Sequence, residues 1–342
     1  LIFKQASGTS RGVLTTKETY LLEISENNKK GIGECAIFRG LSYDDVPDYE
    51  EKLTWLCKNI NLDFEVLKKE LLHYPSIIFG LEQALLNLEH GEDLYFPSDF
   101  TDGKDSIKIN GLIWMGNADF MQSQIEEKLA KGFDCIKLKI GVDWKSEKEI
   151  IKKLREKFPK EQLELRVDAN GAFSYEEARM VLQELADLGI HSIEQPIKKS
   201  EVRSPKSEEN SEKKSTDCCV PWNEMAKLCA ETPTPIALDE ELIGVIDFEE
   251  KKKLLETIKP QYIILKPALV GGFSGSDEWI VLAESLGIDW WITSALESNI
   301  GLNAICQYTY TKKNPLPQGL GTGALFTNNF ETHLQLEGDQ MW

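Results

Sequence analysis

Three acidic residues stand at the ends of successive apolar, β-rich runs in the middle of the chain. Asp168 ends the run RVD, Glu194 ends SIE and Asp239 ends ALD. Carboxylates that converge in this way supply the oxygen ligands that Mg²⁺ and Mn²⁺ prefer. One acidic residue at a strand end often does no more than cap the following helix. Three of them at equivalent positions favour a divalent-metal site instead.

Lysines occupy the same kind of position on both sides of these acids. Lys137 and Lys139 lie two residues apart in the run CIKLKI, so on a strand both point to one face, about 7 Å apart. Lys266 follows the run IIL, and Pro267 keeps it extended. Partial desolvation beside a metal and a second cation disfavours a protonated amine, so we expect a lysine base here. The ordinary alternative is solvated lysines on an edge strand or barrel rim, which the flanking apolar residues disfavour.

The spacing of these residues indicates the fold. The gaps from Lys139 through the three acids to Lys266 are 29, 26, 45 and 27 residues. All but the third suit the strand-plus-helix unit of a (β/α)8 barrel, in which catalytic side chains come from strand ends. The third gap contains the polar stretch Lys198 to Asp217, whose 20 residues include almost no apolar side chains. We expect this stretch to be a disordered insertion.

The periodicity of the whole chain predicts an α/β protein in three parts. These are an N-terminal α+β domain over residues 1–105, a TIM barrel over residues 106–323, and a C-terminal segment over residues 324–342 that packs back on the first domain. In the first part, strands over 19–24 and 31–37 flank a turn, and a helix covers 77–89. In the barrel, residues 318–323 are expected to form a short eighth strand.

Composition narrows the class of partner. The formal charge of −18, without a basic run, opposes nucleic-acid and anionic-membrane partners. No apolar run approaches a membrane span and no signal-peptide pattern is present, so we expect a cytoplasmic protein with a small-molecule partner and no membrane insertion. Seven cysteines without a C-x-x-C pair are typical of reduced core thiols, and four scattered histidines disfavour zinc.

Small residues collect where the last two barrel strands would end. They are Ser294, Ala295 and Ser298, with Glu297 among them, and then Gly319, Gly321 and Gly323. Such residues let backbone N–H groups approach an anion, and the loops after strands seven and eight of a barrel often bind phosphate. This feature alone also fits a phosphosugar enzyme.

Taken together, these residues resemble the enolase superfamily over nearly the whole chain. Its members combine an α+β capping domain with a modified (β/α)8 TIM barrel, and use a lysine or histidine base with Mg²⁺ to stabilise an enediolate. The K-x-K pair on strand two with a lysine on strand six is typical of the muconate-lactonising-like subgroup. The stretch SALESNIG, residues 294–301, is most similar to the o-succinylbenzoate synthases.

The resemblance implies a role for each charged residue. Asp168, Glu194 and Asp239 would bind Mg²⁺, with Mn²⁺ as a substitute. Lys139 and Lys266 would face opposite sides of the α-carbon of a small carboxylate substrate. The implied reaction is dehydration of a cyclohexadiene carboxylate to an aromatic acid: Lys139 removes the proton next to the carboxylate and then protonates the departing hydroxyl. Lys137 would tune Lys139.

The resemblance also implies the surroundings of the substrate. A lid would span Ala6 to Val13, where Arg11 would meet a succinyl carboxylate. The other substrate contacts would be Asn170, Ser294, Ala295, Gly319 and Leu320, with Glu240 and Glu297 behind them.

Two other functions remain open at this point, and the oligomeric state stays open as well. An N-acylamino acid racemase or dipeptide epimerase would use both lysines as bases. The epimerases usually carry Asp-x-Asp on strand eight, whereas the stretch GLGT at 319–322 has no carboxylate. A non-catalytic barrel that binds a small acid is the third reading, but unused buried charges would cost it several kcal/mol.

Overall fold

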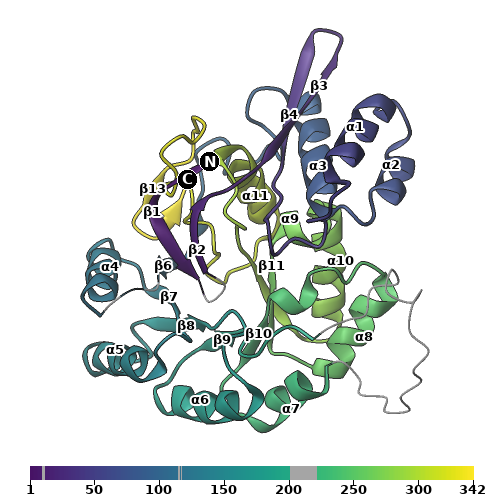
Figure 1. Cartoon of the computed structure of the whole chain (residues 1–342). Helices are drawn as coiled ribbons and strands as arrows, with labels where there is room; N and C mark the ends of the chain where they lie inside the picture. Colours follow the sequence, from purple (N-terminus) through teal and green to yellow (C-terminus); the bar gives the residue numbers. More distant parts are fainter. Residues whose placement is uncertain (10–11, 115, 117, 201–221) are drawn as a thin grey trace, which may run out of the picture.

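The computed structural model describes residues 1–9, 12–114, 116, 118–200 and 222–342 (Figure 1). Arg11 and residues 201–217 of the predicted insertion lie outside these ranges. The predictions for that arginine and for most of the insertion are therefore not addressed by the structure.

Seven parallel strands form the inner wall of a barrel. They are β6 (Gly111–Ile113), β7 (Cys135–Lys139), β8 (Glu164–Asp168), β9 (Ser192–Glu194), β10 (Ile236–Leu238), β11 (Tyr262–Leu265) and β12 (Asp289–Ile292). Each pairs with its sequence neighbours, in the order β6 to β12. These strands are short runs of buried, mostly apolar residues, as expected for a sheet covered on both faces.

The barrel closes through the segment predicted as an eighth strand. Gln318 forms a parallel bridge to Ile109, just before β6, and Gly319 forms one to Thr293, just after β12. The bonds include Gln318 N–H to the Lys108 carbonyl (2.9 Å) and Gly319 N–H to the Ile292 carbonyl (2.8 Å). The predicted position is confirmed, although the pairing amounts to single bridges rather than a full strand.

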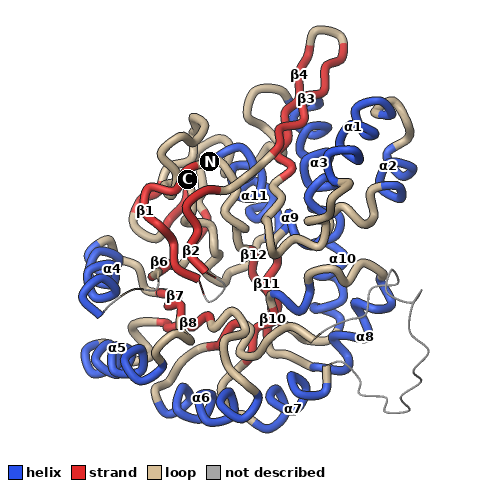
Figure 2. The backbone as a smooth tube through the Cα atoms, in the orientation of Figure 1, coloured by secondary structure: helices blue, strands red, loops and turns tan. Residues whose placement is uncertain are grey.

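Helices alternate with the strands and cover the outside of the barrel (Figures 1 and 2). They are α4 (Ala118–Ala130), α5 (Trp144–Lys157), α6 (Tyr175–Asp187), α7 (Asn223–Glu231), α8 (Phe248–Ile258), α9 (Pro267–Val270), α10 (Gly272–Ser285) and α11 (Asn299–Lys312). The α/β class and the barrel are confirmed. None of the helices in the described part of the chain is long and apolar enough to cross a membrane.

An antiparallel hairpin and three helices make up most of the N-terminal part. They are β3 (Tyr20–Glu26), β4 (Lys29–Cys35), α1 (Tyr49–Asn59), α2 (Phe64–Glu70) and α3 (Pro75–His90). The predicted turn is present, with Asn27 and Asn28 both at positive φ. Strand β4 packs directly on α3, since a side chain at Gly33 would place its Cβ 1.9 Å from the Gly80 carbonyl oxygen.

A second hairpin, β1 (Ile2–Thr9) and β2 (Gly12–Thr16), lies beside the C-terminal segment. Phe3 bridges Phe326, and the Ile2 carbonyl accepts from Thr327 N–H at 2.9 Å. Strand β1 therefore lies beside residues 325–327, near the labelled chain ends in Figure 1. The final hairpin, β13 (Leu336–Glu337) and β14 (Gln340–Met341), pairs instead with β5 (Ile107–Lys108) at the start of the barrel region.

Two buried glutamates join the N-terminal part to barrel helices. Glu82 of α3 accepts backbone N–H groups of Phe273 (2.5 Å) and Ser274 (3.2 Å) in the first turn of α10. Glu34 of β4 does the same for Ser298 (3.0 Å) and Gly301 (2.9 Å) at the start of α11. Carboxylates are stabilised at helix N-termini by the free N–H groups and the helix dipole.

Candidate active site

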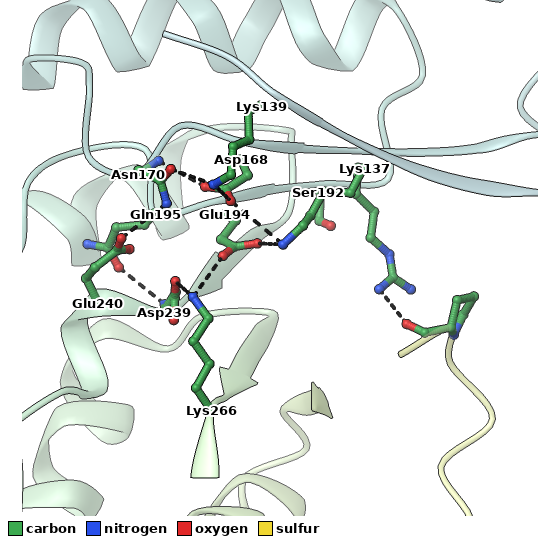
Figure 3. A network of polar contacts seen from close by, with 12 residues as sticks. Lys137, Lys139, Asp168, Asn170, Ser192, Glu194, Gln195, Asp239, Glu240 and Lys266 are labelled. Atoms are coloured by element: carbon green, nitrogen blue, oxygen red, sulfur yellow. Dashed lines mark hydrogen bonds and ion pairs between the residues drawn. The ribbon is translucent and has the colours of Figure 1, made fainter. Parts of the chain in front are cut away.

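The strand register places the predicted charged residues in adjacent positions. Lys139 of β7 pairs with Asp168 of β8, and Asp168 pairs with Glu194 of β9. Asp239 directly follows β10, and Lys266 directly follows β11. Because parallel strands share one carboxyl-terminal edge, all five side chains meet at the same mouth of the barrel (Figure 3).

The lysines and acids form a nearly continuous ion-pair network. Lys139 Nζ lies 2.8 Å from Asp168 Oδ2, and Lys137 Nζ lies 2.8 Å from Glu194 Oε2 and 3.7 Å from Asp168 Oδ2. From the other side, Lys266 Nζ contacts Asp239 Oδ2 and lies 3.7 Å from Glu194 Oε1. Figure 3 shows Lys139 and Lys266 approaching the acids from opposite sides.

Asn170 connects the predicted base to a second acid. Lys139 Nζ donates to Asn170 Oδ1 at 2.7 Å, and Asn170 Nδ2 donates to Glu240 Oε1 at 3.2 Å. Asn170 lies in the turn after β8 at φ +45°, a left-handed conformation that asparagine tolerates better than most residues. This geometry orients the Lys139 ammonium group toward the centre of the barrel mouth.

Burial and opposite charges compete at the network and shift several pKa values. Burial alone would lower the pKa of Lys137, but the Glu194 and Asp168 carboxylates outweigh it and raise that pKa. The same competition, with Asp239 as the main anion, raises the pKa of Lys266. Burial and the neighbouring Asp168 raise the pKa of Glu194.

The acids fit a divalent cation in charge and chemistry. Asp168, Glu194 and Asp239 are all buried, and Glu194 Oε1 has no hydrogen-bond partner among the described residues. No three acidic, histidine or cysteine side chains in the described ranges stand close enough for a complete metal cluster. Lysine ammonium groups lie between the carboxylates, so a metal would require Lys137 and Lys266 to move aside.

A pocket opens above this network. Of the residues predicted from sequence, Lys137, Lys139, Asp168, Asn170, Lys266, Ser294, Ala295 and Gly319 line it. Leu320 is fully buried in the main core. Glu240 and Glu297 are buried behind the pocket wall, Glu240 against Asn170 and Glu297 against Ser294.

Sequence reasoning missed most of the apolar wall. The additional lining residues are Leu14, Phe38, Leu41, Asn110, Leu112, Trp114, Thr293, Leu296 and Thr322, whereas Gly321, which also lines the pocket, was among the small residues predicted near strand eight. Asn110 could have been recognised from the sequence, because it is a polar residue directly before the first barrel strand, β6. Leu14, Phe38 and Leu41 come from the N-terminal part, where nothing local distinguishes a pocket residue from a core residue.

This barrel, with lysines on β7 and after β11 flanking three strand-end acids, defines an enzyme of the enolase superfamily. A family model described as "Enolase C-terminal domain-like" matches residues 121–207. The o-succinylbenzoate synthase of Desulfotalea psychrophila is 42% identical, covering 99% of this chain and 95% of that protein. The chain belongs to the o-succinylbenzoate synthase family of that superfamily.

Solved structures agree with this assignment. The crystal structure of MenC from Desulfotalea psychrophila matches with a TM-score of 0.84 and 39% identity, covering 100% of this chain and 96% of that one. The L-Ala-D/L-Glu epimerase of Bacillus subtilis matches with a TM-score of 0.80 at 20% identity, covering 99% and 92%, which shows a shared fold. An N-succinylamino acid racemase from Thermus thermophilus is 33% identical, covering 52% of this chain and 40% of its own length.

Proposed function

We propose that the protein is a Mg²⁺-dependent o-succinylbenzoate synthase. Its reaction would be the syn-dehydration of 2-succinyl-6-hydroxy-2,4-cyclohexadiene-1-carboxylate to o-succinylbenzoate. One observation supports this most: Lys139 and Lys266 reach a single carboxylate cluster from opposite sides, at the floor of a pocket with an apolar wall. That arrangement can handle a proton on one face of a planar substrate and stabilise negative charge from the other.

Lys139 is the residue suited to proton transfer. As the free amine it takes the proton from the ring carbon that bears the carboxylate, and the electron pair of that C–H bond moves into the carboxylate as a dienolate. The dienolate then expels the hydroxyl group from the neighbouring carbon, and Lys139 returns the proton so that water leaves. The ring becomes aromatic, which makes the second step downhill. Asn170 keeps the amine aimed at this face.

The other charged residues support the developing negative charge. Lys266, which reaches the site from the side opposite Lys139, would stabilise the dienolate as an ammonium. Lys137, which pairs with Glu194 and Asp168 in the structure, would tune Lys139 on the same strand face. Asp168, Glu194 and Asp239 would hold Mg²⁺, which supplies Lewis-acid withdrawal of charge from the substrate carboxylate.

The direct test is ultraviolet detection of the aromatic product, with and without Mg²⁺. The proposal predicts metal-dependent formation of o-succinylbenzoate and its loss in Lys139→Ala. A purified, folded and metal-loaded protein that leaves the cyclohexadiene substrate unchanged would overturn it.

Racemisation of an N-succinylamino acid is the second candidate, because a relative with that name is 33% identical over half of this chain. The two opposed lysines could serve as bases for the two enantiomers. Incubation of each enantiomer in deuterated water separates the functions. A racemase exchanges the α-proton of both enantiomers, whereas a dedicated dehydratase exchanges neither at a comparable rate.

A further inference from the structure

Lys17 is a buried lysine that neither the catalytic network nor the resemblance uses. It follows strand β2, its side chain is buried (7% exposed), and its ammonium nitrogen has no hydrogen-bond partner among the described residues. Its backbone is fixed on both sides: Lys17 N–H donates to the Leu1 carbonyl (2.9 Å), and the Leu1 amino group donates to the Lys17 carbonyl (2.8 Å). A buried, unpaired ammonium costs free energy, so a counter-ion is expected nearby.

Glu297 is the anion that matches it. This residue follows β12 in the loop behind the pocket and is fully buried (0% exposed). Its Oε2 accepts from Ser294 Oγ at 2.6 Å, while its Oε1 lacks a hydrogen-bond partner in the described part of the chain. Burial raises the pKa of Glu297, and the Lys17 charge is the largest influence that opposes this rise. The two unpaired atoms are therefore electrostatic neighbours of opposite charge.

Glu297 controls the conformation of the loop that forms the pocket wall. The Ser294 hydroxyl that donates to Glu297 also accepts from Leu296 N–H at 3.0 Å and from Thr322 Oγ1 at 2.8 Å. Leu296 has φ +63°, a left-handed conformation that costs a residue with a branched side chain of order 1 kcal/mol or more. The Glu297–Ser294 contact thus stabilises a strained backbone whose residues face the substrate.

The same loop packs against the hairpin that carries Lys17. Leu296 forms a small apolar cluster with Phe3 of β1 and Phe326, and Leu14 of β2 and Phe38 pack against that cluster. Leu14, Phe38 and Leu296 all line the pocket. Lys17 Nζ lies 6.0 Å from the centre of the Phe38 ring. The hairpin and the loop therefore meet in this apolar cluster, with Lys17 beside Phe38 on one side and Glu297 next to Leu296 in the chain on the other.

We propose that Lys17 and Glu297, two buried opposite charges that attract each other through space without direct contact, act as a functional charge pair that positions the pocket wall. The pair holds hairpin β1–β2 on the loop over residues 294–297, and so fixes Leu296, Ser294 and Leu14 against the part of the substrate that does not react. Lys17 and Glu297 are positioning residues, because neither lines the pocket. The identity of the substrate rests on the proposed function. The interaction between Lys17 and Glu297 does not depend on it.

Kinetics of paired variants test the role. Lys17→Met and Glu297→Gln should each raise KM about tenfold and change kcat by less than about threefold, since binding contacts are misplaced while the lysine base is intact. The double variant should be no worse than the poorer single variant, and Lys17→Arg should restore KM. Lys4→Met, which changes an exposed lysine of the same hairpin, is the matched control and should behave as wild type. Additive effects of the two single variants would overturn the pairing.

Amide hydrogen exchange gives a readout that does not depend on turnover. In the ligand-free protein, Lys17→Met should speed exchange in Gly12–Thr16 and in residues 294–298, with Lys17→Arg restoring protection and α6 unchanged. Unchanged exchange in both segments would overturn the inference. If the wild-type protein shows no dehydratase activity, the proposed function fails, and the exchange experiment alone still decides whether the pair exists. If Lys17→Met does not fold, the exchange of Glu297→Gln is compared with that of Lys17→Arg instead. Glu297→Gln should then speed exchange in both segments, and Lys17→Arg should not.

Discussion

At the scale of single residues, the site depends on Lys137 and Lys139, which lie on the same face of strand β7 but pair mainly with different carboxylates. Lys137 pairs mainly with Glu194, whereas Lys139 pairs with Asp168 and Asn170. Asn170 gives Lys139 a neutral partner in addition to one carboxylate, while Lys137 lies between two carboxylates. The Asn170 amide orients the Lys139 nitrogen without placing it between two carboxylates. This difference supports Lys139 as the base.

Replacing the proposed base should remove most of the activity without unfolding the protein. We predict that Lys139→Ala lowers kcat roughly a hundredfold to ten-thousandfold, because a positioned general base contributes an effect of that size. Ultraviolet product formation measures the loss. The control is Lys131→Ala, which removes an exposed lysine paired with Glu127 on α4 and should leave kcat unchanged. Equal losses in both variants would contradict a specific role for Lys139.

Neutralising one acid should weaken the metal site. We predict that Glu194→Gln lowers the apparent affinity for Mg²⁺ at least about tenfold, because one anionic oxygen ligand is lost and Lys137 loses its main partner. The Mg²⁺ dependence of activity and the rise in Tm on adding Mg²⁺ both report the affinity. Glu256→Gln, an exposed change on α8, is the control. The assignment is wrong if the variant keeps the wild-type Mg²⁺ response.

The charged residues of the site could be predicted from sequence, but the apolar wall could not. Each charged residue breaks an apolar run at a strand end, which is a local signal with a physical cause. Leu14, Phe38 and Trp114 are apolar residues among other apolar residues, and only the tertiary packing of distant segments makes them pocket residues. Lys17 is a lysine in a polar stretch, and nothing in the local sequence indicates that it is buried.

At the scale of elements, helix α3 carries a buried acid, Glu82, that makes the stability of the fold depend on pH. Glu82 is buried and its oxygens accept from the first turn of α10. Burial raises the pKa of Glu82 to about 7, against the opposing effect of those hydrogen bonds. Between the unfolded value near 4.5 and about 7, the folded state therefore binds more protons at this site than the unfolded state does. Folding is favoured by lower pH across that window.

The stability of Glu82→Gln should differ from wild type in a pH-dependent way. As pH rises from about 4.5 to about 7, the unfolding free energy of wild type should fall by up to about 3 kcal/mol relative to that of the variant. Above pH 7 the difference between the two proteins should stay constant. Urea denaturation at several pH values measures this difference. Glu89→Gln, an exposed change on the same helix, should show no such trend. A flat difference for Glu82→Gln would mean that the carboxyl group stays ionised throughout.

Elements were predicted best where the periodicity was strong. The helix expected over 77–89 is α3, Pro75–His90, and the strand run CIKLK is β7. The eighth strand was harder, because residues 318–323 have little β-propensity and bridge their neighbours only at Gln318 and Gly319. Its presence follows from barrel closure, a constraint of the whole sheet rather than of the local sequence.

At the scale of the whole molecule, Glu34 links the N-terminal part to the barrel. This fully buried carboxylate accepts from Thr19 Oγ1 (2.8 Å) and Ser298 Oγ (2.5 Å), in addition to two backbone N–H groups at the start of α11. Its removal would leave several buried donors without partners, which costs about 1–3 kcal/mol for each. These donors lie on both sides of the contact between the N-terminal part and the barrel. Removing Glu34 should therefore destabilise both parts together.

We therefore predict that Glu34→Ala lowers the unfolding free energy by about 3 kcal/mol or more, and that amides of α3 and α11 lose protection to the same extent. Hydrogen exchange at increasing urea measures both helices in one experiment. Glu23→Ala, on neighbouring β3, removes an exposed acid paired with Lys30 and should have little effect on either helix. If α3 loses protection while α11 keeps it, the N-terminal part unfolds independently, and the pocket wall formed by Phe38 and Leu41 can detach from a barrel that stays folded.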